Sequence, residues 1–198
     1  VASGSQKGYM IPPGLSFIAM SQKAWEAAEK SNLPKFYLNL KSYRKSLLSN
    51  SNPYTPAVNL VFALDEALKM MRDEGLDNIF LRHNKHKLAM SNAVKALNLK
   101  LFADEKYLSP SITAIETGEI DAEEFRKKVK NDFDILMAGG QDHLKGKIFR
   151  VGHLGYINNR DIITVISAIS KTLIDLGQIT TKEVGEALVI ASKYLEED

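Results

Sequence analysis

The chain has 198 residues, 44% of them hydrophobic and 25% charged, and its formal net charge is +2 at pH 7. This composition is typical of a folded globular protein, and the near balance of charges argues against nucleic acid as a partner. The absence of cysteine excludes disulfides and thiolate metal sites within the chain and fits a reducing compartment. Since no apolar run reaches the roughly 20 residues of a membrane-spanning helix, we expect a cytoplasmic protein.

The first part of the chain alternates short apolar runs with breaker residues. A buried strand is predicted over 15–20, and a helix capped by a serine follows over 21–29. Apolar residues three and four positions apart predict a second helix over 36–48. The segment 49–56, rich in proline, serine and asparagine, is predicted to be a loop, and a third helix is expected over 56–75.

The remainder begins with a long helix predicted over 77–97 and then changes to a mixed pattern. Four short runs are compatible with strands, at 99–103, 112–117, 135–138 and 147–151. Three helices are predicted to begin at the cap residues Asp121, Asn159 and Thr180. The middle one carries a stripe of Ile162, Ile166, Ile169, Leu173 and Leu176 that is expected to be buried. This pattern predicts a small α+β domain.

The stretch Ser3-Gly-Ser-Gln-Lys-Gly-Tyr-Met10 offers one reactive amine among small residues. Lys7 lies close to Gly4 and Gly8, so the backbone can approach a ligand closely while hydroxyl and amide groups supply hydrogen bonds. That setting suits a lysine that forms a Schiff base with an aldehyde cofactor. Taken alone, however, a lysine in such a loop is more often part of a surface turn.

The order Ser-Gly-Ser-Gln-Lys-Gly, then Pro-Pro-Gly and an apolar run, is more specific. It resembles the cofactor-lysine segment of the class V pyridoxal-phosphate aminotransferases, in particular the alanine–glyoxylate, serine–glyoxylate and serine–pyruvate group. In that family the lysine bonds to pyridoxal 5'-phosphate, and the glutamine before it contacts the cofactor phosphate. The resemblance therefore implies these roles for Lys7 and Gln6.

The same resemblance implies an α/β fold of the fold-type I PLP-transferases, covering this whole chain but only the C-terminal half of the family's length. Residues 1–75 would be the C-terminal part of the cofactor-binding large domain, 76–98 a connecting helix, and 99–198 the small C-terminal α+β domain. In the family, the residues that pair with the pyridine nitrogen and stack on the ring precede the lysine. They have no counterpart here, so we expect the sequence to be a fragment.

Arg150 lies in Gly146-Lys-Ile-Phe-Arg-Val-Gly-His-Leu-Gly155, near the end of a predicted strand. A guanidinium presents a planar fork of donors that matches a carboxylate, although most arginines are solvated or form surface ion pairs. The segment closely resembles the family segment whose arginine holds the substrate α-carboxylate. The resemblance implies that substrate-binding role for Arg150.

The loop Asn52-Pro-Tyr-Thr-Pro-Ala57 precedes a predicted helix start, where free N–H groups favour phosphate. A plain helix cap by Thr55 is the alternative. The resemblance implies that Thr55, and with less weight Tyr54, reach the cofactor phosphate of a neighbouring subunit, which makes the active unit a homodimer. The four histidines show no recurrent ligand spacing, and we predict no metal site.

These assignments predict a transaminase that moves an amino group from alanine or serine to glyoxylate or pyruvate. A PLP lyase or decarboxylase on the same scaffold remains an alternative, as does a catalytically inactive fragment that serves as a structural or dimerisation piece. A cysteine desulfurase is disfavoured because its thiol nucleophile is missing. A hydrogen-activating subunit is disfavoured because its metal centre needs thiolate ligands, which this chain lacks.

Overall fold

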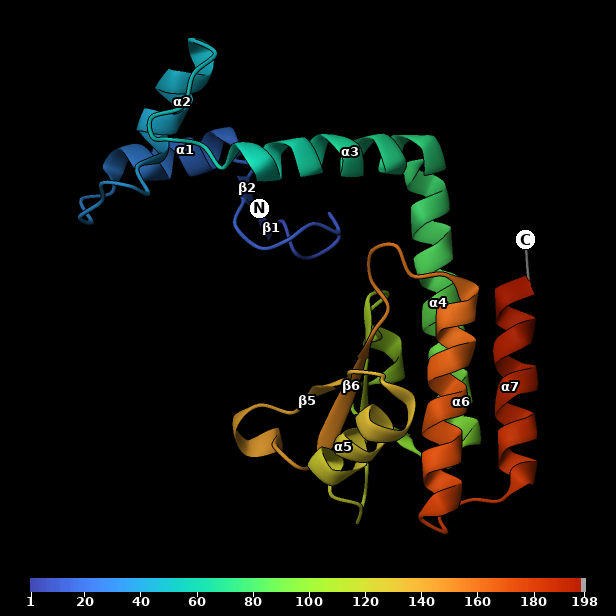
Figure 1. Ribbon diagram of the computed structural model, residues 1–198. Coiled ribbons are helices and arrows are strands. Elements are labelled where there is room, and N and C mark those ends of the chain that lie inside the picture. Colours follow the sequence, from blue (N-terminus) through green and yellow to red (C-terminus); the bar gives the residue numbers. More distant parts are fainter. Residues whose placement is uncertain (197–198) are drawn as a thin grey trace. The chain divides into compact units, whose positions relative to one another are not determined.

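The computed structural model describes residues 1–196, which fall into two compact units divided between Asp73 and Glu74 (Figure 1). The assignment of 1–75 to a large domain, 76–98 to a connecting helix and 99–198 to a small domain stays a prediction. Within residues 1–196, no helix has both the length and the apolar character needed to cross a membrane.

The first unit opens with a two-stranded antiparallel sheet and continues with helices. In the sheet, Ser3 of β1 lies opposite Phe17 of β2. The Ser21 hydroxyl accepts a hydrogen bond from the Ala24 N–H at 3.2 Å and caps the first helix, as the sequence predicts. The elements are β1 Ala2–Gly4, β2 Ser16–Ile18, α1 Gln22–Lys30, α2 Leu40–Leu48 and α3 Val58–Glu74.

Two expectations for this unit are wrong in detail. The predicted strand over 15–20 shortens to 16–18, and Ile18 is 52% exposed because β1 is its only partner strand within the described residues. The helix predicted from Phe36 begins at Leu40, because the Asn39 side chain accepts a hydrogen bond from the Lys41 N–H and caps it there. Phe36 instead packs its ring against Tyr54.

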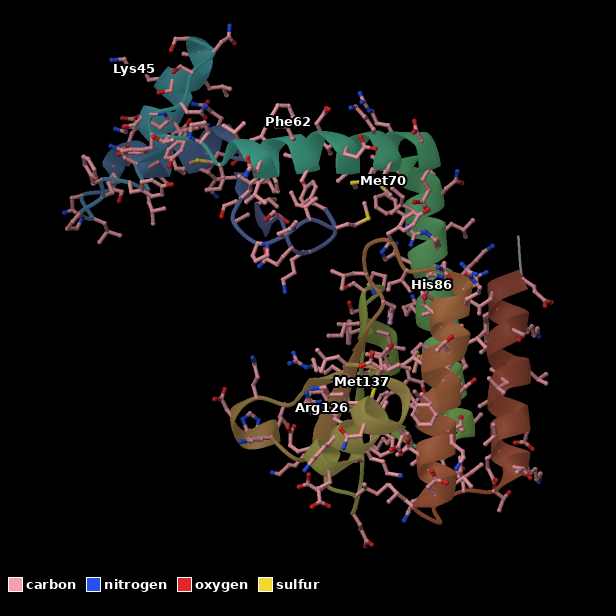
Figure 2. The ribbon with its side chains drawn as sticks, in the orientation of Figure 1. Lys45, Phe62, Met70, His86, Arg126 and Met137 are labelled. Atoms are coloured by element: carbon pink, nitrogen blue, oxygen red, sulfur yellow. The ribbon has the colours of Figure 1, made fainter. Side chains whose placement is uncertain are left out.

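The first unit exposes many large apolar side chains. Phe36, Leu38, Leu48 and Phe62 are each more than 70% exposed, and Figure 2 shows Phe62 on the outside of α3.

The second unit contains a four-stranded antiparallel sheet in the order β3-β4-β6-β5. Strands β3 and β4 lie within the predicted runs 99–103 and 112–117, and β6 is shifted by one residue from the predicted 147–151. Strand β5 shares only Ala138 with the predicted run 135–138, so that prediction is wrong in its bounds. The mixed α/β character expected from the sequence is therefore confirmed. The elements are α4 Leu76–Ala96, β3 Lys100–Leu101, η1 Glu105–Tyr107, β4 Ile112–Glu116, α5 Ala122–Phe133, β5 Ala138–Gly139, η2 Asp142–Leu144, β6 Ile148–Gly152, α6 Asn159–Asp175 and α7 Thr181–Glu196.

The core of this unit lies between one face of the sheet and the helices. Phe149 and Val151 point to this face, and the ring of Phe149 stacks on Phe125 of α5 with centroids 5.0 Å apart. Helices α4, α6 and α7 pack together, and α6 runs antiparallel to α7 (Figure 1). The α6 stripe is buried as predicted from Ile162 to Leu173, but Leu176 is 41% exposed because the helix ends at Asp175.

The cap of α6 lies one residue earlier than predicted. The Asn158 side chain accepts hydrogen bonds from the N–H groups of Arg160 and Asp161, and the Asp161 carboxylate accepts one from the Asn158 N–H. This is a reciprocal capping box. Asn159 is instead the first helical residue, and its side chain links His86 to the Leu195 carbonyl.

His153 and His86 are buried in the second unit. The His153 Nδ1 donates to the Pro110 carbonyl at 3.1 Å, and in the neutral ring its Nε2 accepts from the Thr113 hydroxyl at 2.9 Å. Burial and, to a smaller extent, the nearby His86 together lower the pKa of His153 from 6.5 to about 4. Burial also lowers the pKa of His86, whose Nδ1 has no hydrogen-bond partner within the described residues.

We expect the stability of the full-length protein to fall as the pH drops from about 6.5 to about 4. In this window the unfolded chain binds a proton at residue 153 that the folded chain does not, so protonation favours unfolding by about 3 kcal/mol at most. The measurement is denaturant unfolding of wild type and His153→Gln across this range. The variant should show a shallower loss, whereas the exposed His143→Gln should retain the wild-type slope; identical slopes in all three would contradict the assignment.

Candidate functional site

The residues around Lys7 form a closed loop that is fastened by Ser5. The Ser5 side chain is fully buried; its hydroxyl donates to the Pro12 carbonyl at 2.7 Å and accepts from the Leu15 N–H at 3.2 Å. Its backbone also bonds to Leu15 and to Ile11. These contacts join the two ends of the loop and hold Lys7 at its exposed tip.

Gln6 and Lys7 share this exposed tip. A side chain at position 4 would place its Cβ 2.8 Å from Gln6 Oε1, so Gly4 provides the room in which the glutamine side chain folds back over the loop. A Cβ at Gly8 would meet no atom within 4 Å, so the open side of the loop faces away from its own chain. An amine and an amide thus lie together on an accessible, fastened turn.

Tyr54 and Thr55 lie in the loop before α3. The Tyr54 hydroxyl donates to the Phe36 carbonyl at 3.1 Å, and its ring packs against Tyr37 with centroids 4.7 Å apart. Thr55 is exposed. Because α3 begins at Val58 and the Ala57 carbonyl accepts from the Val61 N–H, Ala57 occupies the cap position, two residues beyond Thr55. Thr55 therefore does not cap α3, and the alternative prediction of a plain helix cap is wrong.

Arg150 lies on β6, the central strand that pairs with both β4 and β5. Its Nε donates to the Gly139 carbonyl at 2.9 Å, which fixes the plane of the guanidinium. Within residues 1–196, the two terminal nitrogens have no hydrogen-bond or ion-pair partner. A half-buried arginine with two parallel donors left over is suited to a bidentate contact with a carboxylate.

The sheet face that carries Arg150 is opposite the core. Side chains alternate along a strand, so the buried Phe149 and Val151 leave Arg150 on the other face. Its direct neighbours across the sheet are Ala114 and Ala138, whose small side chains do not cover the guanidinium.

The segment after β6 is tied to α4 of the same unit. Nη1 of Arg82 donates to the carbonyls of Gly155 and Ile157, both at 2.9 Å, while Nε and Nη2 of Arg82 bond to the Glu74 carboxylate. These hydrogen bonds from Arg82 hold the pKa of Glu74 below its usual value. The strand that carries Arg150 is thus anchored beyond its C-terminal end as well as along its two ladders.

The sequence-predicted residues divide between the units. Lys7 and Gln6 lie on one loop of the first unit, Tyr54 and Thr55 lie on another loop of that unit, and Arg150 belongs to the second unit. Sequence reasoning missed the contacts of three residues: Ser5 closes the Lys7 loop, Gly139 accepts from Arg150, and Arg126 donates to the Met137 carbonyl. A serine two residues before a candidate lysine is a signal for the first, but the other two act through contacts that no local pattern reveals.

Comparison with known proteins gives consistent relatives by sequence and by structure, although no family model matches the chain. A soluble hydrogenase 42 kDa subunit from Anabaena cylindrica is 54% identical over 89% of this chain and 46% of its own length. A serine–glyoxylate aminotransferase from Methylorubrum extorquens is 35% identical, over 99% of this chain and 50% of its own length.

Among solved structures, ureidoglycine–glyoxylate aminotransferase from Bacillus subtilis superposes with a TM-score of 0.87 at 28% identity, over 99% of this chain and 51% of its own. The chain spans about half the length of the curated relatives that it matches. The Methylorubrum relative and the Bacillus structure are both aminotransferases, the kind of enzyme expected from the Lys7 segment. By sequence and by fold, the chain is similar to about the C-terminal half of class V pyridoxal-phosphate aminotransferases.

Proposed function

We propose that the full-length protein is an aminotransferase that uses pyridoxal 5'-phosphate to move an amino group from alanine or serine to glyoxylate or pyruvate. The observation that carries this proposal is the loop around Lys7, which presents a lysine amine and the Gln6 amide on an exposed turn fastened by the buried Ser5. This donor set fits the cofactor, since the amine can bond to its aldehyde while the amide donates to its phosphate.

Lys7 has two tasks in this proposal. Its amine would hold the cofactor by bonding to the aldehyde group. Bound pyridoxal phosphate would supply an electron sink for the reaction at the substrate Cα. The Lys7 amine would also act as the general base and acid that accepts and returns the Cα proton. An exposed lysine at the tip of a fastened loop suits both tasks, because the amine stays near the same point throughout.

Arg150 orients the substrate by its α-carboxylate. Its Nε is committed to the Gly139 carbonyl, so its remaining donors meet the two carboxylate oxygens in one plane. The residues that share its sheet face on β4 and β6 are Ile112, Ala114, Glu116, Ile148 and Gly152, which offer no cation for a second carboxylate. Lys100 of β3 lies on the same face, but its amine is paired with the Glu116 carboxylate at 3.0 Å. This favours a small monocarboxylate such as alanine or serine over a dicarboxylate.

The names of the relatives support glyoxylate as the acceptor. The Methylorubrum and Bacillus enzymes are both named for glyoxylate, whereas their amino donors differ. The hydrogenase name of the Anabaena relative does not guide the assignment of this half, because no cysteine is present to supply thiolate ligands to a hydrogen-activating metal centre.

We further propose that the working unit is a homodimer in which Thr55 and Tyr54 contact the cofactor phosphate of the neighbouring subunit. In its support, Thr55 is exposed and the start of α3 is left uncapped by it. Tyr54 is held by its bond to the Phe36 carbonyl, which keeps the loop ordered before any partner binds.

The test is reconstitution of the full-length protein with pyridoxal phosphate. We expect an absorption band near the violet edge that disappears on borohydride reduction, with the added mass on the peptide that contains Lys7. Addition of alanine or serine should convert the band without reduction, and glyoxylate should restore it. A protein that takes up no cofactor, or that carries the reduced adduct on another lysine, would overturn the proposal.

A further inference from the structure

We propose that Arg126 and Gly139 form a positioning pair that sets the orientation of the Arg150 guanidinium for the substrate carboxylate. This inference rests on the substrate-binding role proposed above for Arg150. Neither residue reaches Arg150 through a side-chain contact of its own. Their effect passes through the backbone of β5, the two-residue strand at the edge of the sheet.

The first link is the carbonyl of Gly139. It accepts the hydrogen bond from Arg150 Nε at 2.9 Å, so the position of this oxygen sets the rotation of the guanidinium about its stem. Gly139 also lies directly opposite Phe149 in the ladder between β5 and β6. A strand of two residues at a sheet edge has few ladder bonds, so its position needs support from elsewhere.

Arg126 of α5 supplies that support. Its Nε donates to the Met137 carbonyl at 2.8 Å, and its Nη1 donates to Glu123 Oε2 at 2.7 Å. Met137 is 4% exposed, so its side chain anchors the same segment in the core. Figure 2 shows Arg126 and Met137 close together beside α5, just before the edge strand. The carbonyl that Arg126 holds lies two residues before the carbonyl that holds Arg150.

Gly139 makes room for this arrangement. A Cβ at that position would overlap both Glu123 Oε1 and Arg126 Nη1, so the ion pair packs directly over the glycine. Arg126 is mostly buried in this contact, with 22% of its side chain exposed. The Arg126–Glu123 ion pair thus packs against the Cα of Gly139, while the Arg150 guanidinium bonds to the carbonyl of the same residue. A shift of this ion pair therefore moves the Gly139 carbonyl and rotates the Arg150 guanidinium.

The test uses the full-length holoenzyme with Arg126→Met, which removes the donors but keeps an unbranched side chain. We expect KM for the amino acid to rise about tenfold, since small misplacements of orienting groups have costs of this order or more. The rate with the amide of the same amino acid, which lacks the carboxylate, should change less than about twofold. Lys127→Met, at the exposed neighbouring position of α5, is the matched control and should behave as wild type.

Two further variants separate positioning from plain stability. Gly139→Ala keeps the Arg126 side chain but displaces it, and should give the same selective loss; Arg126→Lys, which keeps one donor, should lose less. In an Arg150→Met background, Arg126→Met should add almost nothing, because it acts through Arg150. Equal losses with acid and amide, or full additivity with Arg150→Met, would overturn the inference.

The inference and the proposed function fail in different ways. If Arg150→Met itself shows no preference between acid and amide substrates, the carboxylate role of Arg150 falls. The other outcome is that Arg150→Met loses activity with the acid but not with the amide, while both Arg126→Met and Gly139→Ala behave as wild type. In that case the positioning role of Arg126 and Gly139 is wrong, and the carboxylate role of Arg150 is supported.

Discussion

Lys7→Ala in the full-length protein is expected to lower the rate of transamination by at least about 10³-fold, because one residue both bonds to the cofactor and transfers the proton. The amine lies at the tip of a loop whose ends are joined through Ser5, so no other lysine is held at that point. The measurement is the single-turnover reaction with alanine or serine, followed by absorption. The variant should also lose the borohydride-dependent mass increase on the peptide that contains position 7.

The control for this prediction is Lys23→Ala, which removes another exposed lysine of the first unit, on α1. It should retain the rate, the absorption band and the reduced adduct at Lys7. Partial recovery of the Lys7→Ala variant by a small added amine would locate the loss in the proton transfer rather than in folding. A variant with near-normal turnover would show that Lys7 is an ordinary surface lysine.

The sequence predicted correctly those helix starts that are set by residues close together in the chain. Ser21 caps α1, and Glu183 accepts from the Thr180 N–H at the start of α7. Both patterns depend on residues three positions apart, which a sequence displays directly. The start of α2 was missed because the periodic apolar residues continue back to Phe36, whereas the Asn39 side chain stops the helix at Leu40. Burial of the strand over 16–18 was overestimated because burial depends on what lies beside a strand.

The residues of the candidate site show the same difference between local signals and contacts with distant residues. Lys7, Gln6 and Arg150 were singled out from residue type, neighbours and resemblance, and each remains a proposal. The supporting groups were not predicted, because they work through hydrogen bonds to residues distant in sequence. Ser5 bonds to Pro12 and Leu15, and Arg126 bonds to Met137. These contacts join residues 7 to 11 positions apart across turns whose geometry no periodicity describes. The sequence thus indicates the groups proposed to contact ligands more readily than the groups that support them.

Arg150→Met is expected to lower kcat/KM for amino acid substrates by about 10²-fold or more, because the carboxylate loses both of its charged donors on desolvation. The loss should nearly vanish when the amide of the amino acid is the substrate. Steady-state kinetics with the acid and the amide measure this directly, with Arg160→Met, an exposed arginine of α6, as the matched control.

Arg150→Lys decides whether charge or geometry carries the contact. A lysine restores the positive charge but has neither the planar fork nor an Nε to bond with the Gly139 carbonyl. If bidentate geometry is what binds the carboxylate, the lysine variant should recover only a small part of the loss. Recovery close to wild type would show that any cation on this open sheet face suffices, and the fixed plane of the guanidinium would then have no part in recognition.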